Sequence, residues 1–124
     1  MPAQQTIHAA NLRRSAKSKQ FVFIKSAYKI IKVWYEDIVF CEGMKDYTQV
    51  YLKGKASPLL TLHNLKSFLA KLPKEEFIRV HRSYIISLNH VDAIVRSEIY
   101  IGRKIIPIGH SYKNEFYKII EQHS

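Results

Sequence analysis

The sequence predicts a single, mostly β domain that contains two short helices. Short segments of alternating or continuous apolar residues recur from Phe21 onward, which is typical of strands. Gly and Pro separate several of these segments, and only two stretches have the apolar spacing of a helix. With 124 residues, of which 47% are hydrophobic, the chain can bury the core that such a domain requires.

The first predicted strands lie at residues 21–24 and 28–33, which are rich in β-branched and aromatic residues. The three residues between them, Lys25-Ser26-Ala27, suit a hairpin connection. Residues 38–42 form a nearly continuous apolar run, and this pattern is typical of a central strand.

The next predicted strand, residues 47–53, alternates between apolar and polar positions. One face of this strand carries Thr48, Val50 and Leu52. Gly54-Lys55 then predicts a two-residue turn with Gly at its first position. Because Pro58 cannot donate a backbone hydrogen bond, we expect an edge strand in the segment that follows.

A helix is predicted where leucines recur at spacings of three, four and seven, and Pro73 ends it. Its core-facing stripe consists of Leu62, Leu65, Phe68, Leu69 and Leu72. Strands resume at 77–81 and 91–96, and Gly102-Arg103 predicts a second Gly-first turn between 99–101 and 104–106. The chain closes with a short helix that Ser111 can cap. Its apolar side carries Tyr112, Phe116, Ile119 and Ile120.

The formal net charge of +10 predicts a polyanionic partner. Residues 1–20 hold Arg13, Arg14, Lys17 and Lys19 without an acid and show no apolar period, so we expect a flexible basic arm or linker. The domain would then span residues 21–124, which hold 16 basic and 10 acidic residues. A basic tail attached to a domain of nearly ordinary charge is the alternative explanation.

Several classes of protein are disfavoured by the sequence. It has no long apolar run for a membrane span and no secretion signal, so we expect a cytoplasmic protein. The single Cys41 lies in an apolar run and is expected to be a buried thiol. The histidines lack metal-binding spacing, no Gly-rich phosphate loop exists, and no third group orients His81 beside Ser83. We therefore expect neither an enzyme nor a cofactor or metal site.

Four separated blocks carry a family resemblance. They are Ile38-Val39-Phe40-Cys41-Glu42-Gly43-Met44-Lys45-Asp46-Tyr47, the Leu-rich helix, Phe77-Ile78-Arg79-Val80-His81-Arg82-Ser83-Tyr84, and Ile106-Pro107-Ile108-Gly109-His110-Ser111-Tyr112-Lys113. In this order they resemble the LytTR-type DNA-binding domain of bacterial response regulators, over about residues 21–120. The resemblance implies elongated antiparallel β-sheets with short helices, and loops that read successive major grooves of DNA.

The resemblance also implies where DNA is contacted, namely after the central strand, at the end of the Arg-Val-His-Arg-Ser strand, and at the entry to the last helix. These regions correspond to Lys45, Asp46, Tyr47 and Thr48, to His81, Arg82 and Ser83, and to His110, Ser111 and Lys113. Family members often carry Ser-Arg where this chain has Gly109-His110, so an imidazole replaces an expected guanidinium there.

The residues themselves leave some roles open. Arg82 suits the O6 and N7 atoms of a guanine, and its alternative is a surface ion pair. Lys45 suits a phosphate or a guanine unless it is simply solvated. His81 suits a phosphate unless a backbone carbonyl satisfies it, and Lys113 suits a phosphate near the helix N-terminus unless it is merely exposed. Arg79 is expected to be structural and paired with an acid.

Double-stranded promoter DNA is thus the expected partner of a transcriptional regulator, with a homodimer on tandem sites as the family expectation. If the chain is part of a longer regulator, a receiver domain and its sensor kinase would be upstream partners; a short stand-alone regulator is the other reading. Two other functions stay open. Tyr47, Tyr51 and Tyr84 beside basic residues permit single-stranded nucleic-acid binding, and an exposed β edge permits a protein-interaction module.

Overall fold

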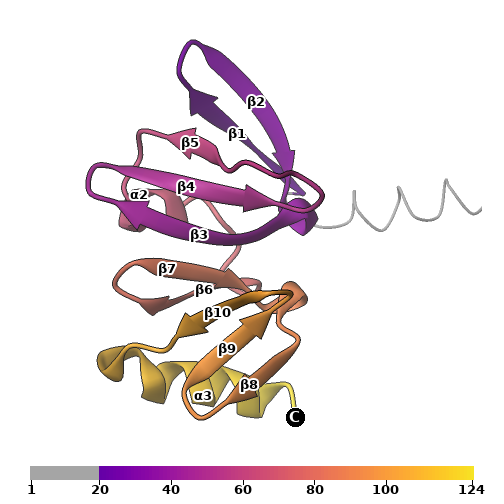
Figure 1. Ribbon diagram of the computed structural model, residues 1–124, viewed down its shortest axis with the longest axis vertical. Coiled ribbons are helices and arrows are strands. Elements are labelled where there is room, and N and C mark those ends of the chain that lie inside the picture. Colours follow the sequence, from indigo (N-terminus) through magenta and orange to yellow (C-terminus); the bar gives the residue numbers. More distant parts are fainter. Residues whose placement is uncertain (1–19) are drawn as a thin grey trace, which may run out of the picture.

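The computed structural model describes residues 20–124, so the arm expected at residues 1–20 falls outside the described part except for its last residue. Ten strands form three antiparallel sheets in this part, stacked along the long axis of the molecule (Figure 1). The predicted fold class, elongated antiparallel sheets with two short helices, is confirmed. None of the helices between residues 20 and 124 is long and apolar enough to span a membrane.

The elements follow one another in a simple order along the chain. The strands are β1 (Phe21–Ser26), β2 (Lys29–Trp34), β3 (Ile38–Met44), β4 (Tyr47–Leu52), β5 (Leu59–Thr61), β6 (Phe77–His81), β7 (Tyr84–Ser87), β8 (Ala93–Val95), β9 (Glu98–Ile101) and β10 (Lys104–Pro107). The α-helices are α2 (Leu65–Leu69) and α3 (Lys113–Gln122), and short 3-10 helices form η1 (Tyr35–Asp37), η2 (Leu88–His90) and η3 (His110–Tyr112).

The middle sheet has the strand order β5-β4-β3-β7-β6. β3 is therefore the central strand, as its apolar run predicts, and β5 forms an edge directly after Pro58, as also predicted. The sequence pattern predicts no strand at β7. Its four residues directly follow the polar cluster of residues 81–83 and form too short a run to show a period.

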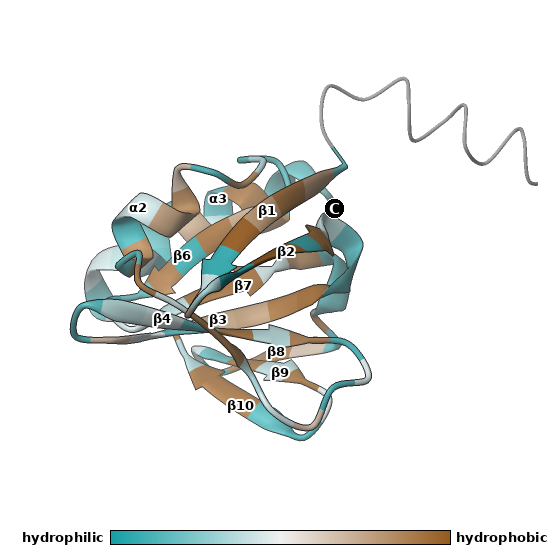
Figure 2. Cartoon of the chain, turned by 90° about the horizontal axis from the view of Figure 1, so that it is seen from above, coloured by the Kyte–Doolittle hydropathy of each residue, from teal (hydrophilic) through white to brown (hydrophobic). Residues whose placement is uncertain are grey.

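Both faces of the middle sheet are buried. Ile85 and Ile86 are neighbours in β7 and point to opposite faces because successive side chains of a strand alternate. Ile85 belongs to a first core with the β1–β2 hairpin and α2, whereas Ile86 belongs to a second core with β8, β9, β10 and α3. Figure 2 shows apolar colour along β1 and β3, as this arrangement requires. The sheet is thus the middle layer between two cores.

The first core is closed by the β1–β2 hairpin and by α2. Asn64 caps this helix, because its Oδ1 accepts a hydrogen bond from the Ser67 backbone N–H at 2.9 Å. The predicted stripe is confirmed at Leu65, Phe68 and Leu72, which are buried. It is wrong at Leu62, which is 83% exposed because the helix begins only after Asn64.

The second core is closed by the three-stranded sheet and by α3. Ile101 pairs with Lys104 across the predicted Gly-first turn, and Gly102 has a φ of +55°, which glycine adopts without steric cost. Phe116 is fully buried, and the rest of the predicted stripe packs around it. Ser111 does not cap the last helix. It lies within η3, and α3 begins only at Lys113.

Two other predicted turns lie elsewhere or have another geometry. Ser26 pairs with Lys29, so the β1–β2 turn consists of Ala27 and Tyr28 and begins two residues later than predicted. Near Gly54, the backbone N–H of Lys55 donates to the carbonyl of Leu52 at 3.1 Å. Gly54 is therefore the second central residue of that turn, with a φ of +75°, instead of the first.

Cys41 lies in β3 and is fully buried in the first core. Burial raises the pKa of its thiol far above the ordinary value, because the thiolate would lose its hydration. The prediction of a buried thiol is confirmed, and this thiol should be chemically inert in the native state.

We expect Ile85→Ala and Ile86→Ala each to lower the free energy of unfolding by about 2–5 kcal/mol, the usual cost of a cavity in a core. Urea denaturation measures this loss. Val95→Ala, at a residue that is 46% exposed, is the control and should change it by less than about 0.5 kcal/mol. If either isoleucine variant behaves like the control, that face of the sheet is not a core.

Cys41 predicts a pH dependence of stability. Because its pKa is raised in the native state, the unfolded chain loses the thiol proton above about pH 8.5 while the native chain keeps it. Deprotonation then favours the unfolded chain, so stability falls as pH rises. The free-energy difference between the wild type and Cys41→Ala, measured in urea at several pH values, should shrink above about pH 8.5. A constant difference up to about pH 10 would contradict this explanation.

Candidate functional site

The register of the middle sheet places the β3–β4 and β6–β7 turns at one edge. β3 runs antiparallel to both β4 and β7, and Glu42 near its end pairs with Tyr84 at the start of β7. The Met44–Tyr47 and His81–Tyr84 pairs close the two turns at this same end of the strands. Figure 1 shows both turns, and the start of α3, along one side of the molecule. We call this side the loop edge.

At the loop edge, one backbone hydrogen bond connects the two turns of the middle sheet. The Gly43 backbone N–H donates to the Ser83 carbonyl at 2.9 Å. A Cβ atom at Gly43 would lie 2.8 Å from the side chain of Leu65, which is buried at the start of α2. Glycine therefore lets α2 pack closely against the end of β3.

A second backbone hydrogen bond connects the residue before η3 to the end of β6. The Gly109 backbone N–H donates to the Val80 carbonyl at 2.7 Å. A Cβ atom at Gly109 would lie 3.0 Å from Cδ2 of Tyr112 and 3.5 Å from Cα of His81. The glycine at this position thus leaves room for the ring of Tyr112, while its contact with His81 of β6 is of ordinary length.

The β3–β4 turn consists of Lys45 and Asp46, and both residues are exposed. Lys45 has a φ of +56°, so the turn holds a non-glycine residue in the left-handed region. Tyr47 is half-buried at the start of β4. Thr48 is fully buried, and its hydroxyl donates to the His63 carbonyl at 2.8 Å. Of the four residues predicted here, the structure therefore keeps Thr48 away from the surface.

The β6–β7 turn consists of Arg82, which is exposed, and Ser83, which is half-buried. The Ser83 backbone N–H donates to Nδ1 of His81 at 3.0 Å. Nδ1 is thus an acceptor, and in a neutral ring the proton lies on Nε2. The imidazole orders the turn through one nitrogen and offers the other nitrogen as a donor.

Arg79 braces the same turn from β6. Its Nε donates to the His81 carbonyl at 3.1 Å, and a terminal guanidinium nitrogen donates to the Arg82 carbonyl. Arg79 therefore has the structural role that we expect from the sequence. Its partners, however, are backbone carbonyl groups instead of the expected acidic side chain. The guanidinium satisfies two carbonyl groups of the turn while it remains only half-buried.

The third segment of the loop edge is η3 with the start of α3. His110 and Ser111 are exposed in η3, and Lys113 is half-buried as the first residue of α3. α3 has no side-chain cap at its N-terminus, because Tyr112 occupies the cap position. The first backbone N–H groups of a helix lack partners within the helix. In this chain, however, the Lys113 backbone N–H already donates to the His110 carbonyl of η3, so the segment offers a hydroxyl and an ammonium group.

Two shallow hollows join the three segments. The first, of about 350 Å³, is lined by Lys45, Arg82 and Ser83 together with Lys66 of α2. The second, of about 390 Å³, is lined by Ser111 and Glu115 among others. Arg79 lines both hollows. The loop edge is consequently one continuous surface.

Lys66 is a member of the loop edge that sequence reasoning does not identify. It lies on the exposed side of α2, where a lysine is expected on any amphipathic helix. Only the packing of α2 against the end of β3 brings this lysine beside Lys45 and Arg82. No signal in the sequence alone could have found it.

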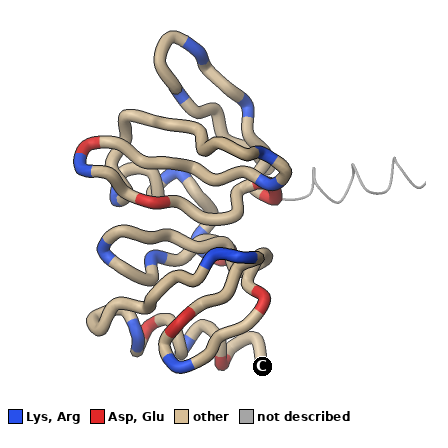
Figure 3. Tube along the Cα trace, in the orientation of Figure 1, with Lys and Arg blue, Asp and Glu red and all other residues tan. Residues whose placement is uncertain are grey.

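Cations outnumber acids along the loop edge (Figure 3). The cations near this edge are Lys45, Lys66, Arg79, Arg82 and Lys113, and the acids are Glu42, Asp46 and Glu115. Residues 20–124 contain no cluster of His, Cys, Asp and Glu side chains that could hold a metal ion. This surface is suited to an extended anion that offers both phosphate oxygens and hydrogen-bonding edges.

Comparisons with known proteins agree with this geometry. The sequence model of the LytTR family, described as the LytTr DNA-binding domain, matches residues 28–121. A solved structure from Bacillus cereus is similar to the chain, with 28% identity and a TM-score of 0.69. It is described as the LytTr DNA-binding domain of a methyl-accepting/DNA response regulator, and the match covers 83% of this chain and 98% of that one. No curated protein matches the chain.

Arg79→Ala should loosen the β6–β7 turn, because two carbonyl groups lose their donor. We expect the free energy of unfolding to fall by about 1–3 kcal/mol and the amide hydrogen exchange of Ser83 to accelerate. Arg79→Lys should behave almost like Arg79→Ala, since an ammonium group lacks the planar fork of a guanidinium.

Lys74→Ala is the matched control for Arg79, because Lys74 is an exposed cation beside the second hollow. This variant should leave the free energy of unfolding and the amide hydrogen exchange of Ser83 nearly unchanged. Equal effects of the Arg79 and Lys74 variants would show that Arg79 does not brace the turn.

Proposed function

The chain belongs to the LytTR family of DNA-binding domains, and on this premise we propose that it binds double-stranded promoter DNA sequence-specifically. In this proposal it regulates transcription as the output domain of a response regulator. The observation that carries the proposal is the loop edge, where three polar, cationic segments from distant parts of the sequence lie in line. A single duplex can meet such an edge with all three segments at once.

Arg82 is the residue that we expect to read a base. It projects from a two-residue turn whose backbone is braced by Arg79 and by Gly43. An exposed guanidinium can donate to O6 and N7 of a guanine in the major groove, a contact worth about 1–3 kcal/mol of discrimination. The neighbouring Lys45 and Asp46 would lie against the same groove, with Lys45 on a phosphate or a guanine. Tyr47 supports their turn from β4.

His81 and Ser83 contribute to the same contact in different ways. Nδ1 of His81 already accepts the Ser83 backbone N–H, so Nε2 is the atom left to donate to a phosphate oxygen. The Ser83 carbonyl is engaged with Gly43, which leaves its hydroxyl for DNA. These bonds hold both residues in place before DNA arrives, which lowers the entropy cost of binding.

The η3 segment is the second point of contact in this proposal. The hydroxyl of Ser111, in η3 directly before α3, suits a phosphate oxygen. Lys113 lies at the positive end of the helix dipole, and a bound phosphate would offset the cost of placing a cation there. His110 replaces the guanidinium common in the family, so we expect a weaker contact from this segment.

The regulatory setting follows from the family. The Bacillus cereus domain is described as part of a response regulator, and the present chain would act in the same way when joined to a receiver domain under a sensor kinase. We propose that residues 1–20 form the arm or linker that leads to residues 21–124. Two copies would occupy tandem sites on a promoter in the cytoplasm. Catalysis has no part in this proposal.

Two of the three tyrosines that permit single-stranded binding, Tyr51 and Tyr84, are engaged in contacts within the domain. The ring of Tyr51 stacks on Phe40 with a centroid distance of 4.3 Å, and the Tyr84 hydroxyl donates to Oε2 of Glu42 at 3.3 Å. Rings held in this way are poorly placed to stack on unpaired bases. These contacts favour duplex DNA over a single strand as the partner.

The proposal is tested with a duplex selected from random sequences, titrated at several salt concentrations. Each neutralised phosphate should contribute about −0.9 to the slope of log affinity against log salt. Arg82→Ala should reduce the preference for the selected duplex over a scrambled one by about 1–3 kcal/mol. Lys113→Ala should weaken both duplexes alike and reduce the slope by about one.

Arg103→Ala is the control, because Arg103 is an exposed arginine on the β9–β10 turn, away from the loop edge. This variant should leave the preference for the selected duplex unchanged. It should alter the slope of log affinity against log salt only by the small effect of removing one positive charge from the protein. Binding of scrambled duplex as tight as that of the selected one would refute sequence-specific recognition. Preference for an oligo-dT strand at equal salt would favour the single-stranded alternative.

A further inference from the structure

A second surface lies between the β1–β2 hairpin and the chain that follows β5. It is a groove of about 700 Å³ whose apolar walls are Phe23, Ile30 and Leu62. These side chains are 58%, 65% and 83% exposed, respectively. Large apolar side chains exposed together usually mark an interaction site. We call this surface the hairpin groove.

Exposed apolar residues are concentrated at this groove. Between residues 20 and 124, nine large hydrophobic side chains are exposed, and five of them lie on the hairpin or on residues 60–62. These five are Phe23, Tyr28, Ile30, Leu60 and Leu62. The loop edge contains only Met44 from this set, so the two surfaces differ in chemical character.

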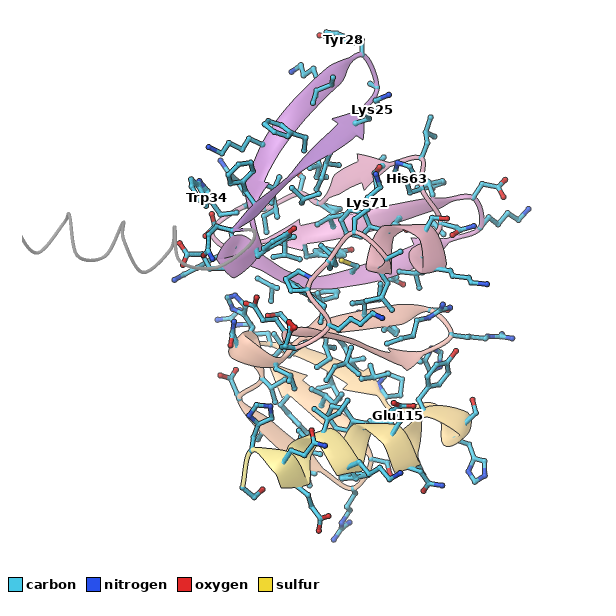
Figure 4. All side chains as sticks on the ribbon, turned by 180° about the vertical axis from the view of Figure 1, so that it is seen from behind. Lys25, Tyr28, Trp34, His63, Lys71 and Glu115 are labelled. Atoms are coloured by element: carbon cyan, nitrogen blue, oxygen red, sulfur yellow. The ribbon has the colours of Figure 1, made fainter. Side chains whose placement is uncertain are left out.

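The rim of the hairpin groove carries two lysines and a histidine. Lys25, His63 and Lys71 line it, and none of its lining residues is acidic. Figure 4 shows Lys25 on the hairpin and His63 and Lys71 below it, on the same side of the molecule. Residues 21–34, which form the hairpin, contain no Asp or Glu. An occupant of this groove therefore needs apolar groups together with negative charge.

Charge argues against two occupants from the chain itself. A second copy that docked by the same surface would bring the same lysines into contact, and like charges repel. Residues 1–20 carry four basic residues and no acid, so they match the rim equally poorly. Neither residues 1–20 nor a second copy docked by the same surface therefore matches the groove.

Nucleic acid matches the charge of the groove but not its apolar walls. Phe23 is the one aromatic wall, whereas Ile30 and Leu62 are aliphatic and offer no ring on which a base could stack. On the hairpin, Nζ of Lys32 lies 4.3 Å from the ring centroid of Phe21 and 4.5 Å from that of Trp34. A lysine already occupies these rings, so they are poorly available to bases.

We propose that the hairpin groove binds a segment of a partner protein in which Asp or Glu residues stand beside large apolar side chains. The apolar side chains pack against Phe23, Ile30 and Leu62, and the carboxylates lie near Lys25, His63 and Lys71. The groove shares no lining residue with the hollows of the loop edge, and the proposal does not depend on the proposed DNA binding. It would let the domain contact a protein and DNA at the same time.

The test is a selection of short peptides from a displayed random library with the whole chain as bait. Enriched peptides should be acidic and apolar, and they should shift the amide resonances of Lys25, Ile30, Thr61 and Leu62 in NMR spectra. Leu62→Ser and Lys71→Glu should each weaken these peptides at least about tenfold, which corresponds to about 1.4 kcal/mol. Both side chains are exposed, so the fold should survive the changes.

Ile105→Ser and Lys118→Glu are the matched controls, since both residues are exposed and lie outside the groove lining. These control variants should change the affinity for the peptides by less than about twofold relative to the wild type, a free-energy change well under 1.4 kcal/mol. The proposal is overturned if no peptide is enriched over the Leu62→Ser bait, or if the enriched peptides are basic or uncharged. It is also overturned if duplex DNA shifts the groove resonances and Leu62→Ser weakens DNA binding equally. If the chain self-associates and Leu62→Ser abolishes this self-association, the groove is a homodimer interface instead.

Discussion

The pairing of β3 with strands on both sides is the constraint on which the rest of the structure depends. Because β4 and β7 both run antiparallel to β3, the turns next to its C-terminal end must emerge at one edge of the sheet. Two glycines then allow close approaches there, Gly43 to α2 and Gly109 to η3. A slip of one residue in this register would reverse the faces of β3 and separate the turns.

This constraint makes the loop edge a firm surface. Two of its three segments are two-residue turns, and each is tied to a neighbouring element by a backbone hydrogen bond or by Arg79. The sheet beneath them is buried on both faces, so it has little freedom to bend. Loops held in this way lose little conformational entropy when they bind an anion, which leaves more of the contact energy for affinity.

The sequence predicts what depends on local pattern, and it fails where tertiary packing decides. The central strand, the Pro58 edge and the Gly102 turn are each encoded in a few adjacent residues. The core position of Thr48 depends on a hydrogen bond to His63, and the exposure of Leu62 depends on the cap at Asn64. Ser111 is displaced from the cap position by η3. Lys66 and the hairpin groove arise from packing between elements far apart in the chain, and no local pattern reports such packing.

The central claim is that a single duplex meets all three segments of the loop edge together. The most direct test follows amide resonances of the chain while a selected duplex is added at fixed salt. The account predicts that Lys45, Arg82 and Ser111 shift with one common midpoint while the β9–β10 turn at Arg103 stays unchanged. If only one of the three segments responds, or if they titrate at different duplex concentrations, the account is contradicted.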